Sequence, residues 1–257
     1  MKRVLFSMVA LSVILFSCNL NSRKDAKSES NSIAKSKITF SNDSTSAFNV
    51  FNYFPQREIK RYGAEVEKYA KQDSVKFPGR GKVLFVGSSS IRKWTTLQHD
   101  MEPIQVINRG FGGSTFPELI YYVNQLIFKY DPKIVVIYEG DNDQLSLTPM
   151  QIKANADYLD SLIHEKLPET KIIFLSVKPS PARRDKLQSS AVTNDYIKKL
   201  CQSNDYTYYG DVWSAMFDKN GKIKTSIFSP DSLHMNVEGY KIWTRIIKNE
   251  IENIEKQ

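Results

Sequence analysis

The chain has 257 residues, of which 41% are hydrophobic and 25% are charged, and its formal net charge is +8. This composition excludes a wholly disordered or fibrous protein, and the length is enough for one hydrophobic core with a short appendage. Aromatic and basic residues are not interleaved as in nucleic-acid-binding surfaces, so we expect a solvated, mixed-charge surface and no nucleic-acid partner.

The first residues are typical of an export signal. Lys2 and Arg3 precede an apolar stretch, residues 4–16, that is too short to span a bilayer as a helix. The following "LFSC" resembles the lipobox of bacterial lipoproteins, which implies cleavage before Cys18 and lipid attachment to that residue. The alternative is a plain secretory signal with an accidental cysteine. We expect a signal peptide over residues 1–17 and a lipoprotein anchored in the bacterial cell envelope, facing the periplasm.

Residues 18–47 are rich in Ser, Asn and Lys and lack periodicity, which is the composition of a flexible tether. The folded domain is expected to occupy residues 48–257. Cys201 is the second of the two cysteines in the chain. With Cys18 acylated, no internal disulfide can form, and Cys201 lies on the apolar face of an expected helix as a buried structural thiol.

From about Phe48 strand and helix signals alternate. A leading helix is indicated by Ile59, Tyr62, Val66 and Tyr69. Five short apolar runs predict buried strands: Val83 to Val86, Gln105 to Ile107, Ile134 to Tyr138, Ile172 to Ser176 and Thr207 to Tyr209. Helical spacing recurs between them in three sets: Leu119, Val123, Leu126 and Ile127; Ile152, Ala156, Leu159, Leu162 and Ile163; and Val192, Tyr196, Leu200 and Cys201.

The second helical set opens with "TPMQ", in which Thr148 and Gln151 form a capping box around a proline at the first helical position. A last helix is expected from Val237 to about Ile254. Strands that alternate with helices imply right-handed crossovers and a parallel sheet covered on both faces. The expected fold class is therefore α/β.

In such a sheet the loops after the strands meet at one edge, where ligands usually bind. The first three strands are followed by "GSSS", "NRGFGGST" and "EGDND", and "SPDSLHMN" precedes the last helix. A serine hydroxyl becomes a good nucleophile only when a neighbour accepts its proton, and histidine is the usual acceptor near neutral pH. One of the three serines is thus a candidate nucleophile.

The chain contains three histidines, His99, His164 and His234. We interpret the first two as structural, because His164 lies inside a helical pattern and His99 has no evident orienting partner. His234 follows Asp231 by three residues, so the carboxylate can reach one imidazole nitrogen and leave the other for a serine. Alone this spacing is a weak signal, and a helix-entry aspartate beside a chance histidine would produce it too.

Acyl transfer also needs donors for the developing oxyanion. Gly113 can present a backbone N–H without a side chain that would block the substrate, and Gly112 beside it gives the turn conformational freedom. A tight turn alone would also explain both glycines. Asn142 can present a side-chain amide, although it is equally suited to a turn or cap. The backbone N–H of the nucleophilic serine, at the start of the next helix, is a third donor.

"GSSSIRKW", "NRGFGGST", "GDND" and "DSLHMN" together resemble the SGNH hydrolases, the GDSL-type esterases and lipases, from Val83 to Tyr240. The resemblance implies a flavodoxin-like three-layer α/β/α sandwich with strand order 2-1-3-4-5 and a serine esterase site. Its motif residues fall on the following positions: nucleophile Ser89, oxyanion hole Gly113 and Asn142, and the pair Asp231 and His234.

This sequence departs from the family motif in that Ser88 replaces the aspartate of "GDSL" and Ser90 replaces the leucine. The departure leaves Ser88 and Ser90 open as alternative nucleophiles to Ser89. "NRG" and "YYVNQL" are most similar to the branch of platelet-activating-factor acetylhydrolase catalytic subunits and bacterial acetyl esterases. The implied chemistry passes through an acyl-enzyme and requires no cofactor and no metal.

The substrate is less well indicated. Arg183 or Arg184, in the loop after the fourth strand, is a candidate to bind an anionic group, and solvated arginines are an equal alternative. Arg109 and Trp94 could shape the site, but packing in the folded domain is sufficient to explain both residues. Because no long apolar lid segment is present, we expect a small acyl group, acetyl above all, on carbohydrate. The alternatives are a short-chain phospholipid or lysophospholipid hydrolase and a non-catalytic glycan-binding module. The oligomeric state is open.

Overall fold

The computed structural model describes residues 60–257. The expected signal peptide, the lipid anchor Cys18, the tether and the first residues of the folded domain lie outside the described residues. Within residues 60–257 no helix has the length and apolar character needed to cross a membrane.

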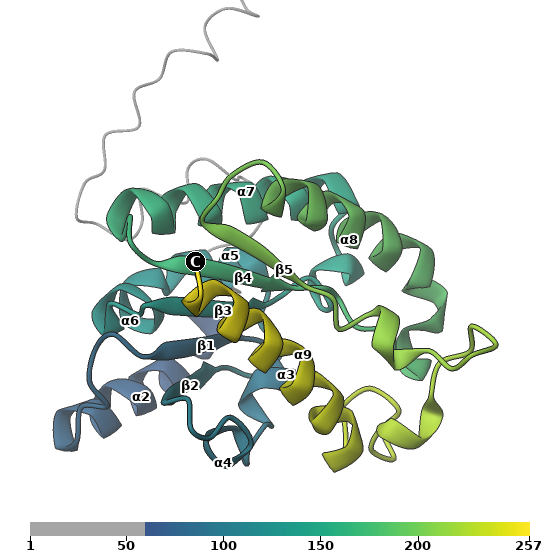
Figure 1. Ribbon diagram of the computed structural model, residues 1–257, viewed down its shortest axis with the longest axis horizontal. Coiled ribbons are helices and arrows are strands. Elements are labelled where there is room, and N and C mark those ends of the chain that lie inside the picture. Colours follow the sequence, from purple (N-terminus) through teal and green to yellow (C-terminus); the bar gives the residue numbers. More distant parts are fainter. Residues whose placement is uncertain (1–59) are drawn as a thin grey trace, which may run out of the picture. The chain divides into compact units, whose positions relative to one another are not determined.

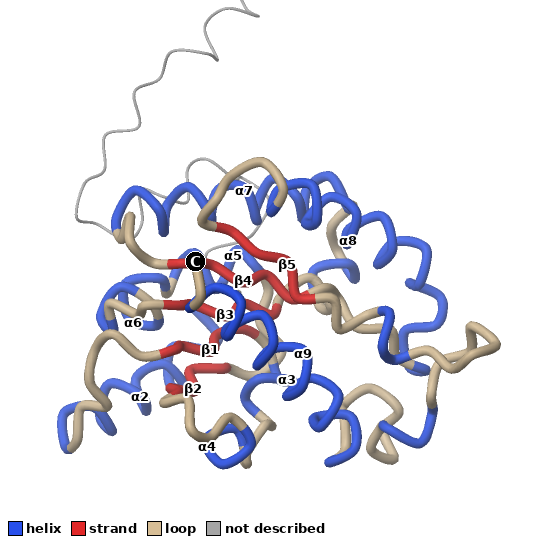
Figure 2. Tube along the Cα trace, viewed as in Figure 1, coloured by secondary structure: helices blue, strands red, loops and turns tan. Residues whose placement is uncertain are grey.

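The core of the fold is one sheet in which all strands are parallel, in the order β2-β1-β3-β4-β5 (Figures 1 and 2). The strands are β1 Val83–Gly87, β2 Val106–Gly110, β3 Ile134–Tyr138, β4 Lys171–Leu175 and β5 Thr207–Gly210. The α/β class and the strand order are as predicted. Strands β1 and β3 are buried along their whole length, as is typical of the centre of a parallel sheet.

Strand β2 differs most from the prediction, whereas β1, β4 and β5 differ from it by one residue at one or both ends. The second strand was expected over Gln105 to Ile107, but β2 begins at Val106 and continues through Gly110. The reason is pairing with β1, because Arg109 and Gly110 lie opposite Val86 and Gly87 in the ladder. The polar "NRG" is therefore the end of a strand, and the loop begins at Phe111.

The helices connect the strands and cover both faces of the sheet. They are α2 Gly63–Val75, α3 Ser89–Arg92, α4 Leu97–Asp100, α5 Phe116–Tyr121, α6 Val123–Leu126, α7 Pro149–Lys166, α8 Leu187–Cys201 and α9 Val237–Glu255. Figure 1 shows α9, in yellow, crossing in front of the strands. Two separate clusters of buried apolar side chains, one on each face, make a three-layer α/β/α arrangement.

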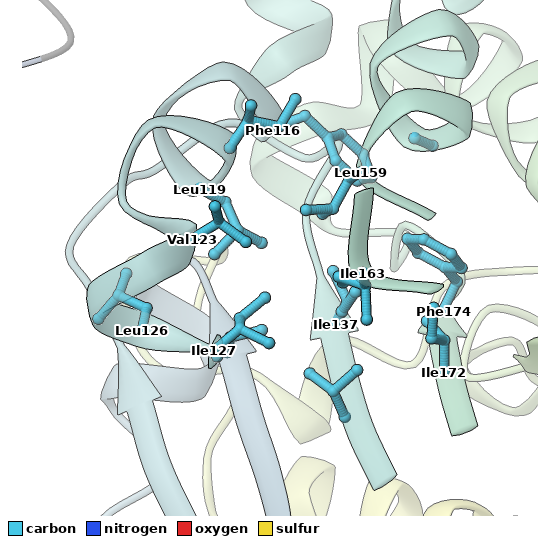
Figure 3. Packing of buried hydrophobic residues seen from close by; sticks show 14 of the residues in the cluster. Phe116, Leu119, Val123, Leu126, Ile127, Ile137, Leu159, Ile163, Ile172 and Phe174 are labelled. Atoms are coloured by element: carbon cyan, nitrogen blue, oxygen red, sulfur yellow. The ribbon is translucent and has the colours of Figure 1, made fainter. Parts of the chain in front are cut away.

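Helices α5, α6, α7 and α8 pack against one face, where Phe116, Leu119 and Leu159 meet strand residues such as Ile137 and Phe174 (Figure 3). On the other face, α9 places Trp243 and Ile247 against the sheet, together with Trp94 from the segment after α3. Trp94 is 1% exposed and lies in aromatic contact with Trp243. The prediction that packing accounts for Trp94 is confirmed.

The predicted helix through Leu119, Val123, Leu126 and Ile127 is interrupted. Helix α5 ends at Tyr121 and α6 begins at Val123, with Tyr122 between them. All four apolar residues are nevertheless buried. The periodicity thus identified the face that contacts the core, whereas the continuity of the helix depended on local backbone geometry.

The two long helices after β3 and before the C-terminus begin as the sequence indicates. Thr148 and Gln151 form the predicted capping box of α7, with the Gln151 N–H donating to Thr148 Oγ1 at 3.4 Å. Asn236 caps α9 by accepting the backbone N–H groups of Glu238 and Gly239. Such caps satisfy donors that the first helical turn leaves without partners.

Helix α2 is fastened to the edge strand through a buried ion pair. Arg109, on β2, donates to Asp73 on α2 at 2.6 Å, and Lys129 and Tyr130 donate to the same carboxylate. Tyr69, one helical turn before Asp73, donates to the carbonyl of Gly110. Arg109 therefore has a structural role, as predicted, and α2 is held beside the end of β2.

Candidate active site

The turn from β1 into α3 presents Ser89 at the carboxyl edge of the sheet. Gly87 ends the strand with a φ of 121°, and a Cβ there would lie 2.1 Å from the Tyr138 carbonyl oxygen on β3. Only glycine is compatible with that approach. The chain can consequently turn sharply after β1, and Ser89 becomes the first residue of α3.

The three consecutive serines differ in exposure. Ser88 and Ser90 are 2% and 1% exposed, whereas Ser89 is partly exposed. Ser88, in the place of the family aspartate, precedes α3 and donates its N–H to the Tyr138 carbonyl. Of the three hydroxyls, that of Ser89 is the one that solvent and a substrate can reach.

Ser89, His234 and Asp231 form a continuous chain of polar contacts. Ser89 Oγ lies 2.9 Å from His234 Nε2, and His234 Nδ1 lies 2.6 Å from Asp231 Oδ2. Both distances are within hydrogen-bond range. If Nδ1 carries the proton and donates to the carboxylate, Nε2 is left as an acceptor for the serine hydroxyl. The arrangement has the geometry of a nucleophile, a base and a group that orients the base.

The loop before α9 holds Asp231 in place. Asp231 Oδ1 accepts the backbone N–H groups of Leu233 and His234 at 3.0 and 2.9 Å. The hydrogen bonds from the His234 side chain and backbone hold the pKa of the Asp231 carboxyl well below its usual range. Ser232 adopts a left-handed backbone with a φ of 57°, which allows this tight turn. The carboxylate therefore remains ionised in any neutral solution.

Lys93 is a charged neighbour of this chain that the sequence analysis did not identify. Its Nζ lies 3.1 Å from His234 Nδ1 and 3.9 Å from Asp231 Oδ2. Lys93 is four residues after Ser89, so a helical turn brings it back to the same side. That spacing was the available signal. The ammonium group adds a positive charge at the edge of the site, next to the aspartate.

Gly113 and Asn142 are brought together by the loops after β2 and β3. Asn142 donates through Nδ2 to the carbonyl of Ser114 at 3.0 Å, directly beside Gly113. An amide nitrogen has two hydrogens, so this bond orients the group and leaves a second donor. Gly113 has a φ of 78°, which a residue with a side chain rarely adopts. Both predicted oxyanion residues thus lie on one side of the same cavity.

That cavity has a volume of about 240 Å³. Its lining consists of Arg61, Tyr62, Gly113, Thr115, Glu118, Asn142, Asp143, Leu145 and Ser146. Most of these side chains are polar or charged. The cavity is slightly smaller than pockets for drug-sized ligands, which measure roughly 300 to 1,000 Å³. It can accommodate a compact polar group next to the oxyanion residues.

A buried ion pair involves Asp141, the residue before Asn142. Lys178, which follows β4, has a fully buried side chain, and its Nζ is 2.5 Å from Asp141 Oδ2. The Tyr138 hydroxyl donates to the same oxygen at 3.1 Å. Asp141 precedes Asn142 in the chain, so these contacts fix the loop that carries the amide. Sequence reasoning missed Lys178, because a lysine after a strand is ordinarily a surface residue.

Of the other predicted candidates, Arg183 lies next to the loop of Asp231, because the N–H of the preceding Ala182 donates to the Ser232 carbonyl. Arg183 has 21% of its side chain exposed and approaches Asp141 Oδ1 with Nε at 3.8 Å, so its nearest charged partner is a protein carboxylate; Arg184 is exposed. His164 stacks on Tyr206, and His99 is exposed beside Glu102. Cys201 is buried, as expected. Burial raises the pKa of its thiol to about 12.

Two buried carboxyl groups, those of Glu139 and Asp143, lie in the loop after β3, and Asp143 also lines the cavity. Asp143 accepts the backbone N–H groups of Phe116 and Gly140, both at 2.9 Å. Glu139 accepts the Ser114 hydroxyl at 2.6 Å through one oxygen, while its other oxygen is buried without a hydrogen bond. Burial, and next the charge of Asp143, raises the pKa of Glu139 well above its usual value. Glu139 is the member of the pair that holds a proton, because Asp143 has more donors.

This pair predicts a pH-dependent stability. Burial raises the pKa of Asp143 to about 7 from a usual value of 3.8. A carboxyl whose pKa is raised by folding stabilises the protein at low pH, and that contribution is lost as the pH rises from about 4 to about 7. Replacing Glu139 by Gln removes the carboxyl that stays protonated in the folded state, so its raised pKa no longer contributes to the pH dependence, and it keeps an acceptor for Ser114. We expect the urea midpoint of the variant to fall less across this range, measured at several pH values.

The size follows from the linkage, since each unit by which folding raises the pKa of a carboxyl removes about 1.4 kcal/mol of stability once the pH exceeds both its unfolded and its folded pKa. Glu169→Gln, at an exposed position, is the matched control and should leave the pH profile of wild type unchanged. An equally steep pH profile in Glu139→Gln would show that Glu139 does not hold a proton in the folded state.

The sequence matches the GDSL-like Lipase/Acylhydrolase family over residues 79–242. Among solved structures, a GDSL-like lipase from Bacteroides thetaiotaomicron superimposes with a TM-score of 0.64 at 23% identity, covering 74% of this chain and 98% of that one. An acetylxylan esterase from Geobacillus stearothermophilus, solved as a catalytic mutant, superimposes with a TM-score of 0.55 at 17% identity, covering 67% and 95%.

These superpositions agree with the three-layer α/β/α fold described above. No functionally curated protein matches the sequence significantly. The family match covers the strand-to-helix turn at Ser89, the loops at Gly113 and Asn142, and the Asp231 to His234 segment. The chain therefore belongs to the GDSL-like lipase/acylhydrolase family of ester hydrolases.

Proposed function

We propose that this protein is a serine esterase that removes small acyl groups, acetyl above all, from carbohydrate. The observation that carries the proposal is the chain of contacts from Ser89 through His234 to Asp231. Gly113 and Asn142 lie in the loops after β2 and β3, at the same edge of the sheet as the turn that carries Ser89. A nucleophile, a base, an orienting carboxylate and an oxyanion site are the groups that acyl transfer requires.

In the first step Ser89 Oγ attacks the ester carbonyl carbon while His234 Nε2 takes the hydroxyl proton. The Asp231 carboxylate holds the imidazole in the tautomer that allows this transfer and stabilises its positive form. The negative charge that develops on the carbonyl oxygen is met by the N–H groups of Gly113 and Ser89 and by the Asn142 amide.

The tetrahedral intermediate then breaks its bond to the alcohol oxygen, which takes the proton from His234 and leaves as the free alcohol. An acyl-enzyme on Ser89 remains. A water molecule attacks its carbonyl carbon as His234 accepts a proton from that water. Collapse of the second intermediate releases the carboxylic acid and returns the proton to Ser89.

Two observations support a small acyl group on a sugar. The cavity beside the oxyanion residues is about 240 Å³, and its surface is about half polar and half apolar, which suits a small group on a hydroxyl-bearing sugar better than a long alkyl chain. The structural neighbours include an acetyl-xylooligosaccharide esterase. Catalytic mutants of that enzyme replace a serine and an aspartate by alanine, the same residue types that we assign to the nucleophile and the orienting carboxylate.

The experiment that tests the proposal compares ester substrates of increasing chain length. With the purified full-length protein, kcat/KM for p-nitrophenyl acetate should exceed that for the octanoate and palmitate esters by at least about tenfold, because longer chains cannot enter a small polar site. Acetylated xylooligosaccharides should release acetate. If activity rises with chain length, or if short-chain phospholipid is the better substrate, the assigned substrate would be a lipid and not a sugar ester.

We further propose that Cys18 anchors the enzyme in the cell envelope, on the periplasmic side. The support is the sequence of residues 1–18, an apolar stretch that ends in "LFSC". Metabolic labelling with a radioactive fatty acid should mark the protein and not its Cys18→Ala variant. Labelling that persists in the variant would contradict the anchor.

A further inference from the structure

The wall of the cavity contains a segment that does not belong to the matched family region. Arg61 and Tyr62 line the cavity together with Gly113 and Asn142. The family match begins at residue 79, so both residues precede it. They lie in the short 3₁₀ turn Lys60–Tyr62 immediately before α2. The wall beside the oxyanion residues thus includes a segment from outside the matched family region.

The segment is held firmly against the loop after β2. Arg61 Nε is 2.7 Å from Glu118 Oε1, and Glu118 is itself buried. The Arg61 guanidinium lies 4.8 Å from the centre of the Tyr62 ring, and that ring packs edge-to-face on Phe111 at 5.4 Å. Ion pairing, cation–π contact and aromatic packing together fix the tyrosine.

The Tyr62 hydroxyl lies close to Gly113. A Cβ built on Gly113 would lie 3.0 Å from the Tyr62 hydroxyl oxygen. A substrate bound at Gly113 therefore has this hydroxyl as a neighbour on the cavity wall. Burial, and next the Glu118 carboxylate, raises the pKa of Tyr62 to about 12, so the group remains a neutral O–H near pH 7. It can donate one hydrogen bond and accept others.

The remaining lining favours a ligand with hydroxyl groups. Thr115 and Ser146 contribute hydroxyls, and Leu145, which is 51% exposed, contributes an apolar rim. An alkyl chain there would remove water from these polar groups without replacing its hydrogen bonds, which is unfavourable.

We propose that Tyr62 determines specificity by hydrogen-bonding a hydroxyl of the sugar that carries the ester. This inference rests on the proposed function and adds a residue from outside the matched family region to its binding site. Arg61 acts through Tyr62 by holding the ring in position. A substrate whose alcohol part has no hydroxyl gains nothing from this contact, so Tyr62 contributes to the choice among esters.

The test measures selectivity, defined as kcat/KM for an acetylated xylooligosaccharide divided by kcat/KM for p-nitrophenyl acetate. Tyr62→Phe keeps the ring and removes the hydroxyl. Loss of one neutral hydrogen bond should lower the selectivity about threefold to tenfold, mainly through KM for the sugar ester. Tyr208→Phe removes a tyrosine hydroxyl that bonds Asp205 and Gln257, and this control should leave the selectivity unchanged.

Three outcomes are distinguishable. A selectivity that falls in Tyr62→Phe and not in Tyr208→Phe supports the proposal. If wild type cleaves sugar esters and Tyr62→Phe has the same selectivity as wild type, the proposal is overturned and the esterase function stands. Equal losses on both substrates count as unchanged selectivity. Wild type that cleaves p-nitrophenyl acetate and no acetylated sugar overturns the proposed substrate class and this inference together. Turnover of p-nitrophenyl acetate in each preparation also reports that the variant is folded.

Discussion

Replacing Ser89 by alanine is expected to lower kcat/KM for p-nitrophenyl acetate by at least about 10⁴-fold. The hydroxyl oxygen that lies 2.9 Å from His234 Nε2 disappears, and with it the proposed acyl-enzyme. The oxyanion donors remain, so a small residual activity above the uncatalysed rate should persist. Steady-state kinetics, with enough enzyme to measure this residual activity, is the appropriate experiment.

The adjacent serines provide matched controls. Ser88→Ala and Ser90→Ala remove hydroxyls that are almost fully buried, and each should change kcat/KM by less than about tenfold, through small shifts of the loop. The departure from the family motif at Ser88 makes this comparison decisive. A large loss in Ser88→Ala with activity retained in Ser89→Ala would move the nucleophile by one residue and contradict the assignment.

Replacing Lys178 by methionine is expected to destabilise the protein by about 3 to 5 kcal/mol, because it leaves the buried Asp141 carboxylate without its closest cation. The midpoint of urea unfolding, followed by circular dichroism, measures the loss. Activity below the transition should fall as well, since Asp141 precedes Asn142 and the loop that carries the oxyanion amide would loosen.

Two further variants separate charge from packing. Lys219→Met changes an exposed lysine and should shift the free energy of unfolding by no more than about 0.5 kcal/mol. In the double variant Lys178→Met with Asp141→Leu both buried charges are absent, and much of the lost stability should return. If Lys178→Met were as stable as Lys219→Met, the buried ion pair would not contribute to the fold as we describe.

The elements that the sequence predicted well are those whose signals are local. Helix α7 begins with the capping box of Thr148 and Gln151, as predicted, because a cap is formed by residues three apart in the chain. The apolar strand Ile134–Tyr138 has the bounds that were predicted for it. By contrast, β2 runs on to Gly110 because β1 lies beside it, and no local pattern in "NRG" indicates a strand.

For the candidate site, the motifs identified Ser89, Gly113, Asn142, Asp231 and His234, and in the structure the Ser89–His234 and His234–Asp231 contacts are within hydrogen-bond distance. Arg183 was considered for an anionic substrate group, and its proximity to Asp141 could not be foreseen, since the two residues are 42 positions apart in the chain. Lys93 had a helical-spacing signal, but its charge became relevant only beside a residue 141 positions away.

By itself, the sequence determined the α/β class, the apolar faces of the helices and the residue types available for acyl transfer, because periodicity, caps and short motifs are properties of neighbouring residues. Only the tertiary structure decided which serine is accessible, which lysine neutralises Asp141, and that Tyr62 lies close to Gly113. These features depend on burial and on contacts between segments far apart in the chain, which arise when the sheet assembles and its loops meet at one edge.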